Sequence, residues 1–113
     1  MLTVQYPKPL SFDDLQLHNA RRAVEWGGNT SLEFAAIELG GEAGECLNKV
    51  KKLIRFQKNM KGGDPSLQPI KDELADVVIC ASLLAIQLGI DLGQAVKHKF
   101  NETSEKHGFQ ERM

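Results

Sequence analysis

The chain has 113 residues, of which 42% are hydrophobic and 26% are charged, and this length and composition predict one domain spanning residues 1–113. The formal net charge is -1, so no excess of positive charge indicates a nucleic-acid-binding protein. No run of about 18 apolar residues predicts a membrane span, and the N-terminal residues lack the apolar core of a signal peptide, so we expect a soluble cytoplasmic protein.

The first half of the chain predicts two helices. Ser11 is a typical N-cap, and two acids follow it in the first turn of a helix that runs to about Trp26. Gly27-Gly28-Asn29 ends this helix. Thr30-Ser31-Leu32-Glu33 then has the form of a capping box, and the apolar periodicity behind it predicts a second helix to about Gln57.

The second half predicts two more helices after a loop. Residues 58–66 are dense in turn formers and lack apolar periodicity, which indicates an exposed, mobile loop. Pro69 suits the first turn of a third helix that ends at Gly89, and Asp91 is the expected N-cap of a fourth helix that ends at Gly108. Because no segment alternates with a two-residue period, we predict an all-α bundle of four antiparallel helices, completed by oligomerisation.

Five acids on the second and third helices share the sides that face the core. At about 100° per residue, Glu38, Glu42 and Glu45 fall within an arc of roughly 60° that borders the apolar side of the second helix. Glu73 and Asp76, spaced i and i+3, share a side with the apolar residues of the third helix. If the two helices form an antiparallel hairpin, Glu42, Glu45, Glu73 and Asp76 meet in one cleft.

Oxygen ligands of this kind suit a hard cation, so we expect Mg²⁺, with Mn²⁺ as a substitute, and Glu38 as a fifth candidate ligand. The alternative is that both pairs of acids are solvated surface charges. A di-iron carboxylate bundle normally requires Glu-x-x-His elements, and none of His18, His98 and His107 lies three residues after a glutamate.

Two ordered motifs resemble a known family. The segment Glu38-Leu39-Gly40-Gly41-Glu42-Ala43-Gly44-Glu45, followed by Asp72-Glu73-Leu74-Ala75-Asp76-Val77-Val78, resembles the ExxE and ExxD motifs of MazG-like nucleoside triphosphate pyrophosphohydrolases. Gly89-Ile90-Asp91-Leu92 and Lys97-His98-Lys99-Phe100-Asn101 are similar to the last helix of that family. The resemblance covers most of the chain beyond Thr30 and is greatest to short stand-alone members of phages or bacteria. The chain departs from the family at Gly41, where many members have an acid.

The resemblance implies Mg²⁺-dependent hydrolysis of a nucleoside triphosphate, expected to be a deoxynucleotide or a non-standard nucleotide, to the monophosphate and pyrophosphate. Glu42 or Glu45 would be the general base, and the residues alone leave this choice open. Glu102 stands where some members have an arginine. The residues that resemble the phosphate-contacting set of the family are Lys97, Lys99, Asn101 and Lys106, and Lys49 is a further candidate.

The nucleobase contacts expected from related dCTP-hydrolysing enzymes are Trp26 and Asn29, although a core or interface position is an equal alternative for Trp26. A homodimer or homotetramer is expected. Three alternatives stay open: a dUTPase of the same fold, a phosphoribosyl-ATP pyrophosphohydrolase, and a non-enzymatic helical module whose acids bind a basic partner or a structural metal.

Overall fold

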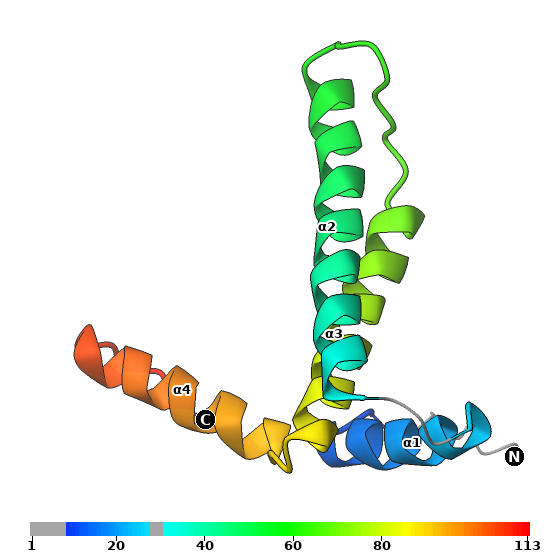
Figure 1. The fold of residues 1–113 in the computed structure, drawn as a ribbon. Coiled ribbons are helices and arrows are strands. Elements are labelled where there is room, and N and C mark those ends of the chain that lie inside the picture. Colours follow the sequence, from blue (N-terminus) through cyan, green and yellow to red (C-terminus); the bar gives the residue numbers. More distant parts are fainter. Residues whose placement is uncertain (1–8, 28–30) are drawn as a thin grey trace, which may run out of the picture.

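The computed structural model describes residues 9–27 and 31–113, and the regular structure within these ranges is entirely helical. Four helices follow one another, and Figure 1 labels them. They are α1 (Phe12–Glu25), α2 (Leu32–Gln57), α3 (Gln68–Gln87) and α4 (Leu92–Lys106). The all-α fold class and the four predicted helices are therefore confirmed.

Side-chain caps explain why three of the helices begin where they do. The Ser11 hydroxyl accepts a hydrogen bond from the Asp14 N–H at 3.0 Å, and the Asp14 carboxylate accepts one from the Ser11 N–H, which completes the predicted capping box of α1. The N-cap of α2 is Ser31, whereas Thr30 of the predicted capping box lies outside the described residues. Asp91 caps α4 as predicted, and its carboxylate accepts from the Gln94 N–H at 3.0 Å.

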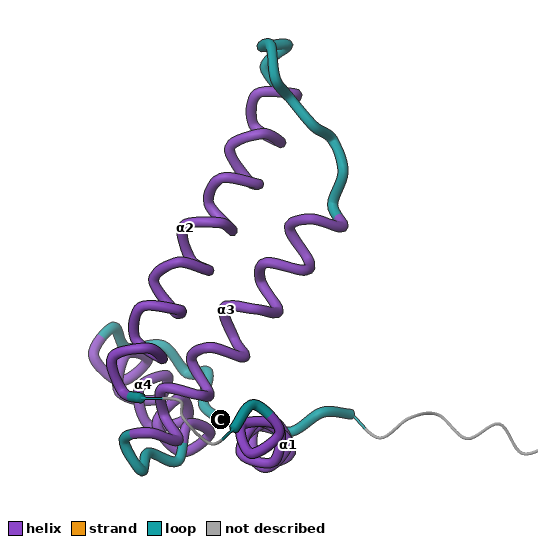
Figure 2. Tube along the Cα trace, turned by 45° about the vertical axis from the view of Figure 1, so that its right-hand side comes forward, coloured by secondary structure: helices purple, strands orange, loops and turns teal. Residues whose placement is uncertain are grey.

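Helices α2 and α3 form an antiparallel hairpin, and they lie side by side in both views (Figures 1 and 2). The loop between them is fixed to α2 at its far end. There the Asp64 N–H donates to the Lys52 carbonyl at 3.0 Å, and a Cβ at Gly63 would lie 2.5 Å from the Phe56 nitrogen. These contacts anchor one end of the loop and help to set the register of the hairpin, while residues 58–63 are exposed as predicted.

Helices α1 and α4 leave the base of the hairpin in different directions (Figure 1). α1 packs on α3, where the buried Asn19 amide donates to the Ile79 carbonyl at 3.2 Å. α4 is held at its N-terminal end, because the Gln16 side chain donates to the Ile90 carbonyl at 2.9 Å and accepts from the Leu92 N–H at 3.2 Å. The rest of α4 extends away from the hairpin as a separate arm.

The packed core is small for a chain of this length. The buried apolar residues among those described are Ala35, Cys46, Cys80, Leu83 and Ala85, and the two cysteines are free thiols. The radius of gyration is 17.9 Å, compared with about 13 Å for a compact domain of 113 residues. The surface of 8827 Å² also exceeds the roughly 6,200 Å² of a compact monomer of this mass. One chain therefore leaves much apolar surface exposed.

No single helix among the described residues is long and apolar enough to cross a membrane. α3 and α4 meet the length and composition criteria only when they are taken together, and the chain bends by 106° between them.

Candidate active site

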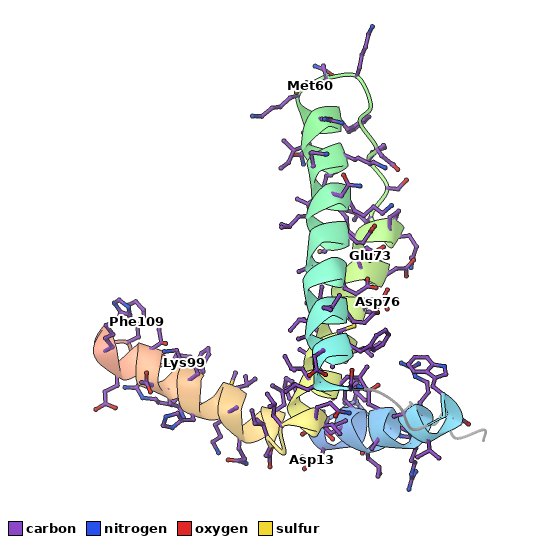
Figure 3. All side chains as sticks on the ribbon, viewed as in Figure 1. Asp13, Met60, Glu73, Asp76, Lys99 and Phe109 are labelled. Carbon is purple, nitrogen blue, oxygen red and sulfur yellow. The ribbon has the colours of Figure 1, made fainter. Side chains whose placement is uncertain are left out.

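The hairpin brings together acids from two motifs that lie about thirty residues apart in the sequence. One carboxylate oxygen each from Glu42, Glu73 and Asp76 lies within 4.8 Å of the others. Glu42 and Glu73 are half-buried, whereas Asp76 is exposed. Figure 3 labels Glu73 and Asp76 on the side of α3 that lies beside α2. We call these three residues the acid cluster.

The acid cluster is electrostatically strained. The pKa of Glu42 is raised, first because its carboxyl group shares a hydrogen bond with Glu73, then because of partial burial, and then because of the negative charges of Asp76, Glu73 and Glu38. The ion pairs found among the described residues lie elsewhere, on α4. A bound cation would relieve this repulsion, and three carboxylates are the oxygen ligands that a hard divalent cation prefers.

The other two predicted acids occupy different positions. Glu45 is exposed and does not belong to the group of ligand atoms within 4.8 Å. It lies one turn beyond Glu42 towards the C-terminus of α2. Glu38 lies one turn before Glu42 and is half-buried, and its charge contributes to the raised pKa of Glu42. Three of the four carboxylates predicted to converge therefore do so. Glu38 and Glu45 lie on α2, one turn before and one turn after Glu42.

A cavity of about 350 Å³ opens beside the acid cluster. Its acidic end is lined by Glu38, Glu42 and Asp76, and its wall includes Cys80. Burial raises the pKa of the Cys80 thiol, and the negative charges of Glu42, Glu38 and Asp76 raise it further, while the positive charge of Arg22 opposes them. The thiol is therefore neutral at physiological pH, and Cys80 serves as an apolar part of the wall.

The other end of the same cavity is aromatic. It is lined by Trp26 from the end of α1 and by Phe34 from the start of α2, which are 62% and 50% exposed. The Arg22 guanidinium lies 4.9 Å from the centre of the Trp26 ring, a cation–π contact. The cavity therefore combines exposed aromatic rings with the carboxylates of the acid cluster.

The sequence prediction included Trp26 but missed Arg22 and Phe34. Their spacing contained the signal, because Arg22 is four residues before Trp26, and Phe34 is four residues before Glu38. Residues at i and i+4 share one side of a helix, so both should have been considered with their neighbours. Asn29, the second predicted base contact, lies outside the described residues.

The predicted phosphate contacts on α4 do not lie at the acid cluster within one chain. Figure 3 labels Lys99 on the arm formed by α4, far from Glu73 and Asp76. Lys97 and Lys106 are exposed on the same helix. The Lys99 ammonium pairs with Glu102 at 3.1 Å. The Asn101 side chain accepts a hydrogen bond from the Met113 N–H at 2.9 Å.

Lys49 lies on α2 itself, two turns beyond Glu42, and is half-buried, as is Lys52. Their positive charges contribute to a lowered pKa of Asp64, although the hydrogen bonds that Asp64 accepts from Ser66 lower it more.

The glycines of the first motif, Gly40, Gly41 and Gly44, face open space among the described residues, because a Cβ at any of them would meet no atom within 4 Å. Tight packing inside one chain therefore does not explain these glycines.

The helical hairpin and its acid cluster define an all-α protein with a carboxylate-rich site suited to a divalent cation. The MazG-like family matches residues 41–113, which is more than half of the chain, and the chain belongs to this family. Both acidic motifs of the acid cluster lie within the matched region. Members of the family are generally nucleotide pyrophosphohydrolases that depend on a divalent metal. No match was found among curated proteins.

Proposed function

We propose that the protein hydrolyses a nucleoside triphosphate to the monophosphate and pyrophosphate in a Mg²⁺-dependent reaction. The observation that carries this proposal is the acid cluster of Glu42, Glu73 and Asp76, which adjoins a cavity with an aromatic far end. A metal-binding end and a stacking end within one cavity match the phosphates and the base of a nucleotide. Membership of the MazG-like family supports the same reaction class.

Glu42, Glu73 and Asp76 would hold the Mg²⁺, and Mn²⁺ would be a substitute because it prefers the same oxygen ligands. When bound, the ion supplies charge for the phosphate oxygens and lowers the pKa of a coordinated water. Glu38, which lines the cavity, would orient solvent or add a fourth carboxylate oxygen.

Glu45 is our choice for the general base. It is an acid one turn from Glu42 that lies outside the acid cluster, so its carboxylate is free to accept a proton. Hydrolysis adds one water across the anhydride between the α- and β-phosphates. The water oxygen bonds to one phosphorus, its proton passes to the carboxylate, and the bridging oxygen leaves with the electron pair on the other product.

The nucleobase would stack between Trp26 and Phe34, with the Arg22 guanidinium held against Trp26 as a hydrogen-bond donor. The substrate class is a deoxynucleotide or a non-standard nucleotide. A dUTPase or a phosphoribosyl-ATP pyrophosphohydrolase would use the same metal ligands, so the identity of the base distinguishes these activities.

The active form would be a homodimer or homotetramer. α4 carries an open apolar groove of about 710 Å³, lined in part by Val96, Phe100 and Phe109. The large surface and the extended shape of one chain support association through such a groove. Association would also allow Lys97, Lys99, Asn101 and Lys106 of α4 to serve the acid cluster of a second copy. Phe100→Asp should then shift the protein to monomers in light scattering and abolish activity.

The test is release of pyrophosphate from a panel of standard and modified nucleotides, with and without Mg²⁺. We expect Mg²⁺-dependent release from a small subset of the panel, and at least a hundredfold loss of kcat for Glu42→Gln and Asp76→Asn. A folded wild-type protein that releases pyrophosphate from no nucleotide would contradict the enzymatic function and leave a non-enzymatic metal-binding or interaction module. Full activity in both variants would contradict only the assignment of the ligands.

A further inference from the structure

Helix α2 presents three kinds of chemistry in order along one side. Phe34 is at its start, the acids Glu38 and Glu42 follow, and Lys49 and Lys52 lie towards its end. With a rise of 1.5 Å per residue, Lys49 is about 10 Å beyond Glu42 and Lys52 about 15 Å beyond it. The aromatic end of the cavity therefore lies on one side of the acid cluster, and the two lysines lie on the other.

The register of the hairpin also places the lysines between the acid cluster and the loop that joins α2 to α3. The Asp64 N–H donates to the Lys52 carbonyl, and the Glu42 carboxyl group shares a hydrogen bond with Glu73. Lys49 lies on α2 between these two points of contact. Side chains on a helix lean towards its N-terminus, which directs Lys49 and Lys52 back towards the acid cluster. Both lysines are half-buried rather than fully solvated.

Neither ammonium group has a hydrogen bond or an ion pair within 4 Å among the described residues. Both positive charges contribute to the lowered pKa of Asp64. Asp64 is also engaged with the Ser66 N–H, at 2.8 Å. The ammonium groups of these two half-buried lysines thus retain donors for an anion that approaches along α2 from the acid cluster.

We propose that Lys49 and Lys52 bind the β- and γ-phosphates of the substrate, and hence the pyrophosphate product. This inference rests on the proposed function. The substrate then lies along α2, with its base between Trp26 and Phe34, its α- and β-phosphates at the acid cluster, and its terminal phosphate towards the loop between α2 and α3. The lysines act in the same subunit as the metal ligands, so this phosphate contact does not depend on α4 of another copy.

The test measures binding of each product separately by calorimetry in the presence of Mg²⁺. Lys49→Ala and Lys52→Ala should each weaken binding of pyrophosphate about tenfold, because each removes one charge-assisted contact. Binding of the nucleoside monophosphate should change less than twofold. Trp26→Ala should do the reverse, with weaker binding of the monophosphate and unchanged binding of pyrophosphate.

Lys51→Ala is the matched control. It removes the same charge from the same part of α2, but Lys51 is exposed on another side of the helix. Binding of pyrophosphate should change less than twofold in this variant. Circular dichroism and melting curves check that every variant is folded.

Three results would overturn the inference. Equal weakening in Lys51→Ala and Lys49→Ala would show only general electrostatic attraction. Weaker binding of the monophosphate in the Lys49 and Lys52 variants would show that the substrate binds in the opposite orientation. Absence of pyrophosphate binding by the wild-type protein would refute the proposed phosphate site at Lys49 and Lys52. Because the assay needs no turnover, a protein that binds pyrophosphate through these lysines but hydrolyses no nucleotide would refute the proposed function and leave this site in place.

Discussion

Replacement of Asn19 by alanine tests how α1 is attached to the hairpin. Asn19 is 4% exposed, and its side-chain amide donates to the Ile79 carbonyl at 3.2 Å. The substitution removes one buried hydrogen bond, worth about 1 kcal/mol, together with the packing of the amide, so we expect a total loss of roughly 1 to 3 kcal/mol. For a chain of this size, each kcal/mol lowers Tm by roughly 4 °C or more.

The same substitution should affect the candidate active site, because α1 carries one wall of the cavity. Arg22 and Trp26 lie one and two turns beyond Asn19, and Ile79 itself lines the cavity. We therefore expect KM for the nucleotide to rise while binding of Mg²⁺ alone is unchanged. Urea unfolding at a fixed protein concentration measures the stability, and steady-state kinetics measure KM.

The control is His18→Ala, which removes an exposed neighbour on the same helix and should change stability by less than about 0.5 kcal/mol. An unchanged urea midpoint in Asn19→Ala would refute the claim that this hydrogen bond fixes α1. Lower stability with an unchanged KM would show that α1 does not form a wall of the substrate site.

Four further substitutions test the loop, the core and α2. Asp64→Asn should lower Tm at neutral pH. The lowered pKa of Asp64 stabilises the folded protein above the unfolded value of about 3.9, and this stabilisation is lost as the pH falls and folded Asp64 becomes protonated, so the Tm difference should shrink in acid. An equal Tm difference at all pH values would contradict this. Ser82→Ala should leave stability unchanged or raise it by up to about 1 kcal/mol, since Ser82 is 0% exposed and its hydroxyl has no hydrogen bond among the described residues. A large loss of stability in urea unfolding would show that the hydroxyl has a partner. Gly63→Ala should destabilise the folded protein by roughly 1 to 3 kcal/mol, because the added Cβ would meet the backbone of Phe56. Gly44→Ala should stabilise α2, because the space around Gly44 is open. A higher melting temperature for Gly63→Ala than for Gly44→Ala would contradict the loop structure.

The helices could be predicted from the sequence because their start and stop signals are local. Ser11 and Asp91 cap helices through hydrogen bonds to the N–H three residues later, and Gly89 and Gly108 end helices with positive φ. The capping box at Thr30 was less well predicted, because the cap is Ser31. Adjacent serine and threonine residues offer similar oxygens, so sequence alone does not distinguish them.

The acid cluster could be predicted only in part. The spacing placed Glu42, Glu73 and Asp76 on facing sides of two helices, and the hairpin brings them together. Glu45 was expected in the same cleft, but one further turn of α2 takes it out of the group. Its position depends on the register of the hairpin, which the Asp64 and Gly63 contacts with α2 help to set, and no local signal encodes that register.

The position of α4 could not be predicted from its residues. The motif in residues 97–101 indicates candidate phosphate contacts, but it does not indicate the direction in which α4 leaves the hairpin. That direction depends on the turn after Gly89 and on the two hydrogen bonds of Gln16.

The central claim, that the acid cluster is a metal site, is tested most directly by the melting temperature of the wild-type protein and of Glu42→Gln, each with and without Mg²⁺. The raised pKa of Glu42 means that its charge opposes folding at neutral pH, so the metal-free variant should melt at a higher temperature than the metal-free wild type. Mg²⁺ should stabilise the wild type by about 2.7 kcal/mol at a hundredfold excess over Kd, and it should stabilise the variant far less. Equal stabilisation of both proteins by Mg²⁺, or of neither, would contradict the account.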